Sequence, residues 1–255
     1  LRLVTHRMEH VESASLGVWV DVGARYEPAS CNGVSHLLEH MAFKGTKRRS
    51  ARRIAEEIEA VGGQLNAYTS REVTAYHATV LKEDVALGID IITDILQHPV
   101  FDETELGRER AVVLQEIGQT QDTPDDIVFD RFQETAFPDQ PMGWPVLGPP
   151  EIVAAMPGEV LRGYMVNSLF VSLASGFGVL LLGSITAYVF ARYRFPGSNI
   201  LFYIIISVMM IPGILTLVPS VQLVTALNLR NSYTVLILPY IATGQAFAIF
   251  VFRSF

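Results

Sequence analysis

The last third of the chain has almost no charge. The 92 residues from Tyr164 to Phe255 contain no Asp, Glu, Lys or His, and their only charged side chains are Arg192, Arg194, Arg230 and Arg253. A soluble domain carries about 25% charged residues, so an ordinary soluble core does not explain this segment. The first 163 residues are instead acidic, with 15 basic and 26 acidic side chains and a net charge of −11. The composition therefore indicates two segments of different character.

Cysteine is also nearly absent. The single residue Cys31 excludes an intramolecular disulfide and a metal site built from several cysteines. The acidic surplus of the first segment argues against binding to nucleic acid, which requires a basic surface. Leu1–His10 is charged and lacks an apolar run, so we expect no signal peptide at this end.

The first segment has the patterns of an α+β fold. Alternating apolar residues predict strands at Leu1–Arg7, Ser13–Val22, Gln64–Ser70 and Val73–Leu81. Helical spacing predicts helices at Gly33–Phe43, Ser50–Val61, Glu83–Gln97, Asp102–Gln121 and Pro124–Thr135. Asp102 is the expected N-cap of its helix, with Glu105 three residues later as in a capping box. Because strands and helices come in clusters, we expect an antiparallel sheet packed against helices.

One helix carries a pattern typical of metal sites, His36-Leu37-Leu38-Glu39-His40. Residues four apart share a helix face, so His36 and His40 can both reach one metal ion, and Glu39 lies on the same side without being a ligand. This H-x-x-E-H order is the inverse of the commoner H-E-x-x-H zinc helix. A catalytic zinc ion needs a third protein ligand, for which Glu109 and Glu116 are candidates. The alternative is that both histidines are ordinary polar residues on the surface of an amphipathic helix.

The surroundings of this pattern point to a family. The neighbouring segments are Asn32-Gly33-Val34-Ser35, Met41-Ala42-Phe43-Lys44-Gly45-Thr46 and Gly62-Gly63-Gln64-Leu65-Asn66-Ala67-Tyr68-Thr69-Ser70-Arg71-Glu72. Together they resemble the insulinase (pitrilysin-type) metallopeptidases, in the branch of mitochondrial processing peptidase and its bacterial relatives. The resemblance extends from Leu1 to about Met165.

The resemblance implies a zinc cofactor and a role for each site residue. The family's third zinc ligand lies 76 residues beyond the second histidine, which is Glu116 here. Glu109 matches an acidic residue that supports the zinc site, and its alternative is a solvated helix carboxylate. Asn66 and Ala67 match an edge strand that binds extended peptides, and their alternative is an ordinary sheet edge.

The implied activity is hydrolysis of peptides by a zinc-activated water. Glu39 would accept the proton of that water and pass it to the leaving amine. The acidic surplus suits basic peptide substrates such as targeting presequences. Members of the family continue into further strands and a second, related domain or subunit. Residues 1–165 are therefore expected to be a truncated peptidase domain, soluble when separated from the rest.

The second segment, residues 166–255, is predicted to be an all-α transmembrane segment. A helix needs about 20 apolar residues to cross a bilayer. Three spans fit the uncharged stretches: Ser168–Phe190, Ile200–Val221 and Tyr233–Phe252. The alternative, a buried soluble helical core, lacks the charged faces that solubility requires. Arg192 and Arg194 place their loop in the cytoplasm, so we expect a multi-pass protein in contact with membrane lipid, in a bacterial inner membrane.

A second resemblance lies in this segment. Its residues are Asn167-Ser168-Leu169, Ala187-Tyr188-Val189-Phe190-Ala191-Arg192-Tyr193-Arg194-Phe195-Pro196-Gly197 and Met210-Ile211-Pro212. They resemble the permease subunits of maltose-type sugar ABC importers, from Asn167 to Phe255. The implied partners are a second permease, an ATPase and a sugar-binding protein.

The sequence is compatible with three hypotheses. The chain is a zinc endopeptidase tethered to a membrane, a permease subunit for sugar transport with an unrelated front end, or a chimaera in which neither part works as it stands. The join near residues 163–167 has no Pro-, Gly- or Ser-rich linker. Natural fusions usually join complete domains through exposed linkers, which favours the chimaera.

Overall fold

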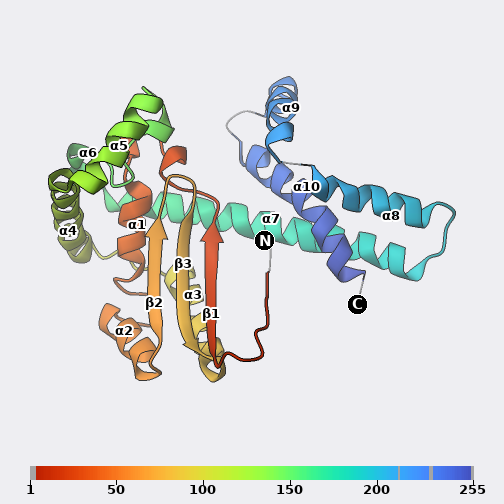
Figure 1. Cartoon of the computed structure of the whole chain (residues 1–255), viewed down its shortest axis with the longest axis horizontal. Coiled ribbons are helices and arrows are strands. Elements are labelled where there is room, and N and C mark those ends of the chain that lie inside the picture. The colour runs from red at the N-terminus through yellow and green to blue at the C-terminus, as the bar shows by residue number, and fades with distance from the viewer. Residues whose placement is uncertain (1–3, 212, 230–231, 254–255) are drawn as a thin grey trace. The chain divides into compact units, whose positions relative to one another are not determined.

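The computed structural model describes residues 4–211, 213–229 and 232–253 (Figure 1). It divides into two compact units, one made of Met8–Tyr164 and the other of Leu1–Arg7 with Met165–Phe255. The first unit contains the strands β1 (Ser13–Val20), β2 (Gln64–Thr69) and β3 (Thr74–Leu81) and the helices α1 (Val34–Ala42), α2 (Ala51–Ala60), α3 (Val85–Gln97), α4 (Glu103–Asp122), α5 (Pro124–Ala136) and α6 (Pro150–Ala155). The second contains most of α7 (Gly158–Arg192) and the helices α8 (Ser198–Ser207), α9 (Gly213–Ala226) and α10 (Tyr233–Phe252). The predicted α+β class is confirmed for the first unit.

The sheet of the first unit is antiparallel, with β3 between β1 and β2. Leu16 of β1 pairs with Ala78, and Ala67 of β2 pairs with Tyr76. Leu65 and Ala67 are half-buried, whereas Asn66 between them is exposed. This alternation is the period of two that the sequence predicted. Within the described part of the chain, β2 pairs with β3 alone, so its other side is an edge of the sheet.

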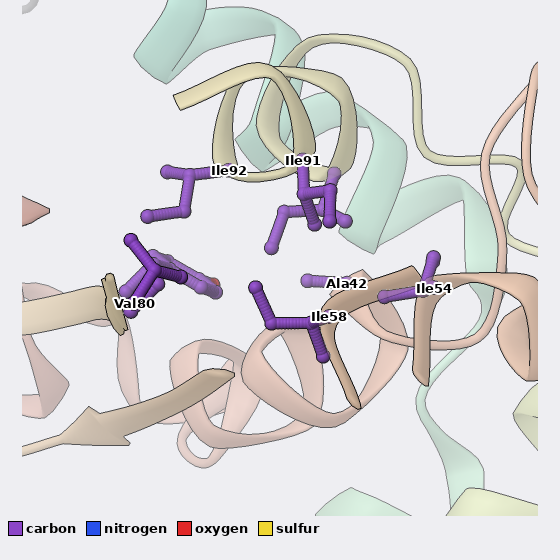
Figure 2. Close-up of a cluster of buried hydrophobic side chains, with 9 residues drawn as sticks. Ala42, Ile54, Ile58, Val80, Ile91 and Ile92 are labelled. Carbon is purple, nitrogen blue, oxygen red and sulfur yellow. The ribbon is translucent and has the colours of Figure 1, made fainter. Parts of the chain in front are cut away.

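Helices cover one face of this sheet and enclose the core. Figure 2 shows Ile91 and Ile92 of α3 above Val80 of β3, with Ile54 and Ile58 of α2 beside them. Tyr76, Ala78 and Ile95 complete the cluster with Ala42. Ala42 is the last residue of α1, so the helix that carries the histidines ends inside this core.

A buried carboxylate ties the loop after α1 to α3. Asp94 of α3 is 1% exposed and accepts hydrogen bonds from Thr46 Oγ1 at 2.7 Å, Arg49 Nη1 at 2.9 Å and Arg48 Nε at 3.0 Å. Arg49 also donates to Asp90. Burial by itself raises the pKa of Asp94, but the hydrogen bonds from Thr46, Arg49 and Arg48 outweigh it, so the pKa is lowered. Asp94 is therefore an anion that several donors satisfy, and it fixes the path of residues 46–49.

In the first unit, the five predicted helices and the predicted strands Ser13–Val22, Gln64–Ser70 and Val73–Leu81 are confirmed to within two residues. Asp102 caps α4 as expected, since its side chain accepts from the backbone N–H groups of Thr104 and Glu105. The strand predicted at Leu1–Arg7 is wrong for residues 4–7, which form no strand. Leu1, Arg2 and Leu3 lie outside the described residues. Alternation alone does not make a strand, because a strand also needs a partner for its backbone hydrogen bonds.

The second unit consists of helices joined by short turns. Phe190, Phe202 and Ile249 form a small cluster between α7, α8 and α10. A Cβ atom on Gly183 of α7 would lie 2.8 Å from the Cβ of Ala248 on α10, so only glycine permits this approach of the two helices. Among the residues that the structure describes, two helices, α7 and α10, are long and apolar enough to cross a membrane.

The middle predicted span, Ile200–Val221, is wrong as a single helix. Helix α8 ends at Ser207, a turn of 3₁₀ helix follows, and the chain is extended at Ile211 with ψ 117° before α9 begins at Gly213. Ile211 precedes Pro212, and the residue before a proline is disfavoured in helical conformation. Pro212 itself lies outside the described residues. The conformational restriction on Ile211 therefore interrupts residues 200–221, which hydropathy alone predicts to be one helix.

We predict that Asp94→Asn destabilises the first unit by about 3 kcal/mol near neutral pH, because it removes the buried anion that accepts from Thr46 and from the buried Arg49. The lowered pKa of Asp94 means that its contribution is present above the ordinary carboxyl pKa of about 3.9 and is lost as the pH falls through the folded-state value. Hydrogen–deuterium exchange of α3 and β3, measured on the full chain in detergent micelles, should show faster exchange in the variant at pH 7 and a difference from the wild type that shrinks as the medium becomes more acidic.

The matched control for this prediction is Asp122→Asn, which removes an exposed aspartate at the end of α4 and should leave exchange unchanged. An Asp94→Asn effect of the same size at pH 3 and pH 7 would show that the ionised carboxylate is not what stabilises the unit.

Candidate metal centre

A buried carboxylate holds the start of the histidine helix α1. Glu27 is 4% exposed and accepts from the backbone N–H groups of Gly33 and Ser35, both at 2.7 Å, and from Asn32 Nδ2 at 2.9 Å. Gly33 itself has φ +95°, a conformation that favours glycine. A carboxylate at a helix N-terminus satisfies unpaired donors and complements the helix dipole. Glu27 therefore fixes where α1 begins and how its first turn is oriented.

Three side chains predicted as metal ligands lie together. One ligand atom from each of His36, His40 and Glu116 lies within 4.8 Å of the other two. Nε2 of His36 and Nε2 of His40 are each 3.5 Å from Oε2 of Glu116. The two rings are nearly perpendicular, at 72°, with centroids 4.7 Å apart. Helices α1 and α4 pack against each other, which brings residues 80 positions apart in the sequence to one place.

The 3.5 Å separations fit a tetrahedral metal better than direct hydrogen bonds. Good N–H···O bonds are about 2.7–3.2 Å long. Ligands about 2.1 Å from a tetrahedral zinc ion are about 3.4 Å from one another. Burial, and then the charge of His40, lower the pKa of His36 to about 4, so His36 is neutral near pH 7 and its lone pair can bind a metal. The donor set of two imidazoles and one carboxylate is one that catalytic zinc sites use.

The second nitrogen of His40 has a partner of its own. Nδ1 of His40 is 3.0 Å from Oε2 of Glu109, and Glu109 is 6% exposed. The buried residues of α4 are Leu106, Glu109, Val113 and Ile117, so Glu109 occupies a position on the apolar face of its helix. An Nδ1–H that donates to a carboxylate leaves Nε2 free to bind a metal. The structure therefore places Glu109 against His40, not in solvent.

Glu39 lies between the two histidines in the sequence, and one oxygen of its carboxyl group accepts no hydrogen bond from the described residues. Its half-buried carboxyl group has one atom, Oε2, that is buried and without a hydrogen-bond partner among the residues that the structure describes. Burial raises the pKa of Glu39, against the opposing effects of hydrogen bonds from Thr69 and of the charge on His40. A carboxyl group with a free acceptor beside a metal-ligand set is suited to taking a proton from water.

Asn66 and Ala67 lie on β2, at the edge of the sheet. The backbone N–H of Ala67 donates to Oδ1 of Asn66 at 2.8 Å and so does not pair with another strand. Helix α1 packs against β2, and Thr69 Oγ1 approaches the backbone oxygen of Ser35. The predicted peptide-binding edge therefore runs beside the helix that carries His36 and His40.

Sequence reasoning missed three residues at this centre: Glu27, Thr69 and Lys44. Lys44 Nζ is 2.8 Å from Oε1 of Glu109. Glu27 and Thr69 act through hydrogen bonds to other parts of the chain, and no spacing in the sequence reveals such contacts. The sequence does indicate that Glu109 has a polar contact. It lies in the apolar stripe of an amphipathic helix, where a carboxylate needs a polar partner.

Comparisons with known proteins place this centre in a family. The family model described as Insulinase (Peptidase family M16) matches residues 2–150. A protein of Bacillus subtilis named uncharacterized zinc protease YmxG is 44% identical over 165 residues, which is 65% of this chain and 40% of that protein. A probable mitochondrial-processing peptidase subunit beta of Arabidopsis thaliana is also 44% identical over 165 residues, 65% of this chain and 31% of that protein. The chain thus spans two fifths or less of the length of these two relatives.

A solved structure of a protease has a similar fold. A protease from Helicobacter pylori has a TM-score of 0.58 at 25% identity, and the match covers 61% of this chain and 38% of that protein. The names of the Bacillus and Arabidopsis relatives agree with the sequence-based prediction of a zinc peptidase of the processing-peptidase type.

The region after residue 150 lies outside the family match. The resemblance of residues 167–255 to sugar permeases, and the chimaeric origin inferred from it, gain no support from these matches and stay predictions. The structure adds only that α7 and α10 are apolar and long. The match over residues 2–150 covers more than half of the chain, and the chain therefore belongs to the insulinase family of peptidases, family M16.

Proposed function

We propose that this chain is a zinc-dependent endopeptidase in which His36, His40 and Glu116 are the metal ligands. The observation that carries the proposal is the equal 3.5 Å separation of the two histidine Nε2 atoms from Oε2 of Glu116. The Bacillus relative, whose name is that of a zinc protease, supports the choice of metal.

Each side chain has a part in the proposed reaction. When bound, zinc lowers the pKa of a water molecule and polarises the carbonyl group of the peptide. Glu39 accepts the proton of the attacking water at its unpartnered Oε2 and then donates it to the leaving amine. Glu109 holds His40 through Nδ1 and so keeps Nε2 turned towards Glu116.

The substrate is proposed to be a peptide that binds in extended form along β2. The edge of β2 lies beside α1, and an added strand would use backbone groups of this edge. The N–H of Ala67 donates a hydrogen bond to the Asn66 side chain, and this bond would have to break before a peptide could pair with that N–H. The net charge of −11 in the first 163 residues favours basic peptides. Presequences are one such class, suggested by the processing peptidase among the relatives.

A second peptidase-like domain or subunit is the proposed partner. The Arabidopsis relative is called subunit beta, and this chain matches 31% of its length. A partner that supplies further peptide-binding surface would complete the substrate site.

We predict that Glu39→Gln abolishes peptide cleavage but retains the metal, whereas His36→Ala loses both. Removing a general base costs about 10²–10⁴-fold in rate, while removing one of three ligands weakens zinc binding itself. The measurements are zinc per chain after dialysis and cleavage of a basic, extended peptide by the full chain in detergent micelles.

Glu59→Gln is the matched control, because it removes an exposed carboxylate on α2 and should change neither result. Cleavage by Glu39→Gln at the wild-type rate would contradict the role of Glu39. A folded wild-type chain that retains no zinc would contradict the metal site.

We further infer that the second unit lies in a lipid bilayer. Its helix α7 exposes large apolar side chains, among them Leu173, Phe177 and Ile185, each more than half exposed. Only 17% of the most apolar part of α7 and of α10 is buried. A soluble protein rarely leaves so large an apolar surface uncovered, and contact with lipid would cover it.

We predict that the full chain remains with phospholipid vesicles through an alkaline wash and flotation. Leu173→Lys combined with Phe177→Lys should release much of it, since a lysine near the centre of a membrane helix costs about 3 kcal/mol. Phe129→Lys, which changes an exposed aromatic residue on α5 of the first unit, is the control and should have no effect. Recovery of the wild-type chain away from the vesicles would contradict the inference.

A further inference from the structure

Lys44 is the one amino group that contacts the buried carboxylates of the metal centre among the described residues. It follows Phe43, the C-cap of α1, and its Nζ is 2.8 Å from Oε1 of Glu109. The Glu109 side chain is 7% exposed and the Lys44 side chain 32%. The ion pair therefore has one end inside the protein and the other end at its surface.

The two oxygens of Glu109 have different partners. Oε1 faces Lys44, and Oε2 faces Nδ1 of His40 at 3.0 Å. On the far side of the imidazole ring, Nε2 of His40 lies 3.5 Å from Glu116. Lys44, Glu109 and His40 thus form a chain of contacts that begins at the protein surface and ends at the proposed ligand atom.

Because Lys44 and His40 contact different oxygens of the same carboxylate, Lys44 influences the orientation of the His40 ring. A carboxylate is planar, so fixing Oε1 limits its rotation and sets the direction of Oε2. A buried carboxylate is also costly without a cation nearby. If Lys44 were lost, Glu109 could turn its charge towards solvent and away from His40, and the imidazole would lose the contact that orients its ring.

We propose that Lys44 is a positioning residue of the metal centre, which holds Glu109 in the orientation that directs His40 Nε2 towards the metal. This inference rests on the proposed function, because it requires that His40 binds a metal. It adds a residue outside the H-x-x-E-H pattern and outside the ligand set.

The competing explanation is that the Lys44–Glu109 ion pair only fastens α1 to α4. Both explanations allow a loss of stability when Lys44 is replaced. They differ in the metal environment, since an ion pair that only fastens two helices would leave the coordination geometry unchanged.

The test uses the full chain in detergent micelles and Co²⁺ as the probe, because bound Co²⁺ reports both affinity and coordination geometry through its visible absorption. Lys44→Met keeps the aliphatic part of the side chain and removes the charge. We expect it to weaken Co²⁺ binding about 10–100-fold, the usual effect of losing a residue that orients a metal ligand, and to change the absorption spectrum. Lys44→Arg restores the cation and should return both properties towards the wild type.

Lys47→Met is the matched control. Lys47 is an exposed residue three positions further along the same loop, so its replacement removes the same charge nearby and should leave affinity and spectrum unchanged. An equal loss of affinity in both variants would overturn the proposal, because the effect would then be one of general charge.

A double-mutant cycle tests the route through Glu109. If Lys44 acts by way of Glu109, Lys44→Met should have no further effect on Co²⁺ affinity in a Glu109→Gln background. Additive effects would overturn the proposal. Wild-type affinity and spectrum in Lys44→Met would overturn it while leaving the proposed function intact, whereas absence of Co²⁺ binding by the folded wild-type chain would overturn both.

Discussion

The packing of α1 against α4 is the contact on which the candidate centre depends. Helix α1 supplies His36 and His40, one turn apart, and α4 supplies Glu109 and Glu116, two turns apart. The imidazole of His40 lies between the two glutamates, with Nδ1 at Glu109 and Nε2 at Glu116. A shift of α4 by one residue would move its side chains by about 1.5 Å along the axis and about 100° around it, and both contacts would be lost.

Several independent features fix this packing. Glu27 holds the first turn of α1 by its backbone N–H groups, and Ala42 anchors the last turn in the core beneath the sheet. The apolar residues Leu106 and Val113 lie with Glu109 on the buried face of α4. Asp94 holds the loop that leaves α1. The ligands therefore lie on one helix, α1, that is held at both ends and on another, α4, that is packed along its buried face, and metal ligands need such firm placement.

Much of this arrangement could be predicted from the sequence, because it follows from local periodicity. The alternation in Gln64–Thr69 and the H-x-x-E-H spacing on α1 are local patterns, and the cap at Asp102 is another. The contacts of Glu27 and Lys44 could not be predicted, since they depend on where distant backbone and side chains meet. The strand expectation, for residues 4–7 of Leu1–Arg7, and the single span expected at Ile200–Val221 were wrong for related reasons. A strand needs a partner, and hydropathy does not register the effect of Pro212 on the residue before it.

The two units differ in what stabilises them. The first is an acidic α+β unit with a packed core and ion pairs. The second exposes large apolar side chains on α7 and α10, which are proposed to contact lipid. The family match ends within the first unit, at residue 150, so the proposed peptidase chemistry concerns that unit alone. The proposed role of the second unit is a matter of location in the membrane, not of catalysis.

X-ray absorption at the zinc edge, recorded on the zinc-loaded full chain, tests the proposed metal site most directly. We expect two imidazole nitrogens and carboxylate or water oxygens at about 2.0–2.2 Å in a four-coordinate shell. His40→Ala, which lacks one of the three ligands as His36→Ala does, should not retain this zinc shell. A sulfur ligand from Cys31, or a shell of six oxygens without imidazole, would contradict the assignment of His36, His40 and Glu116 as ligands.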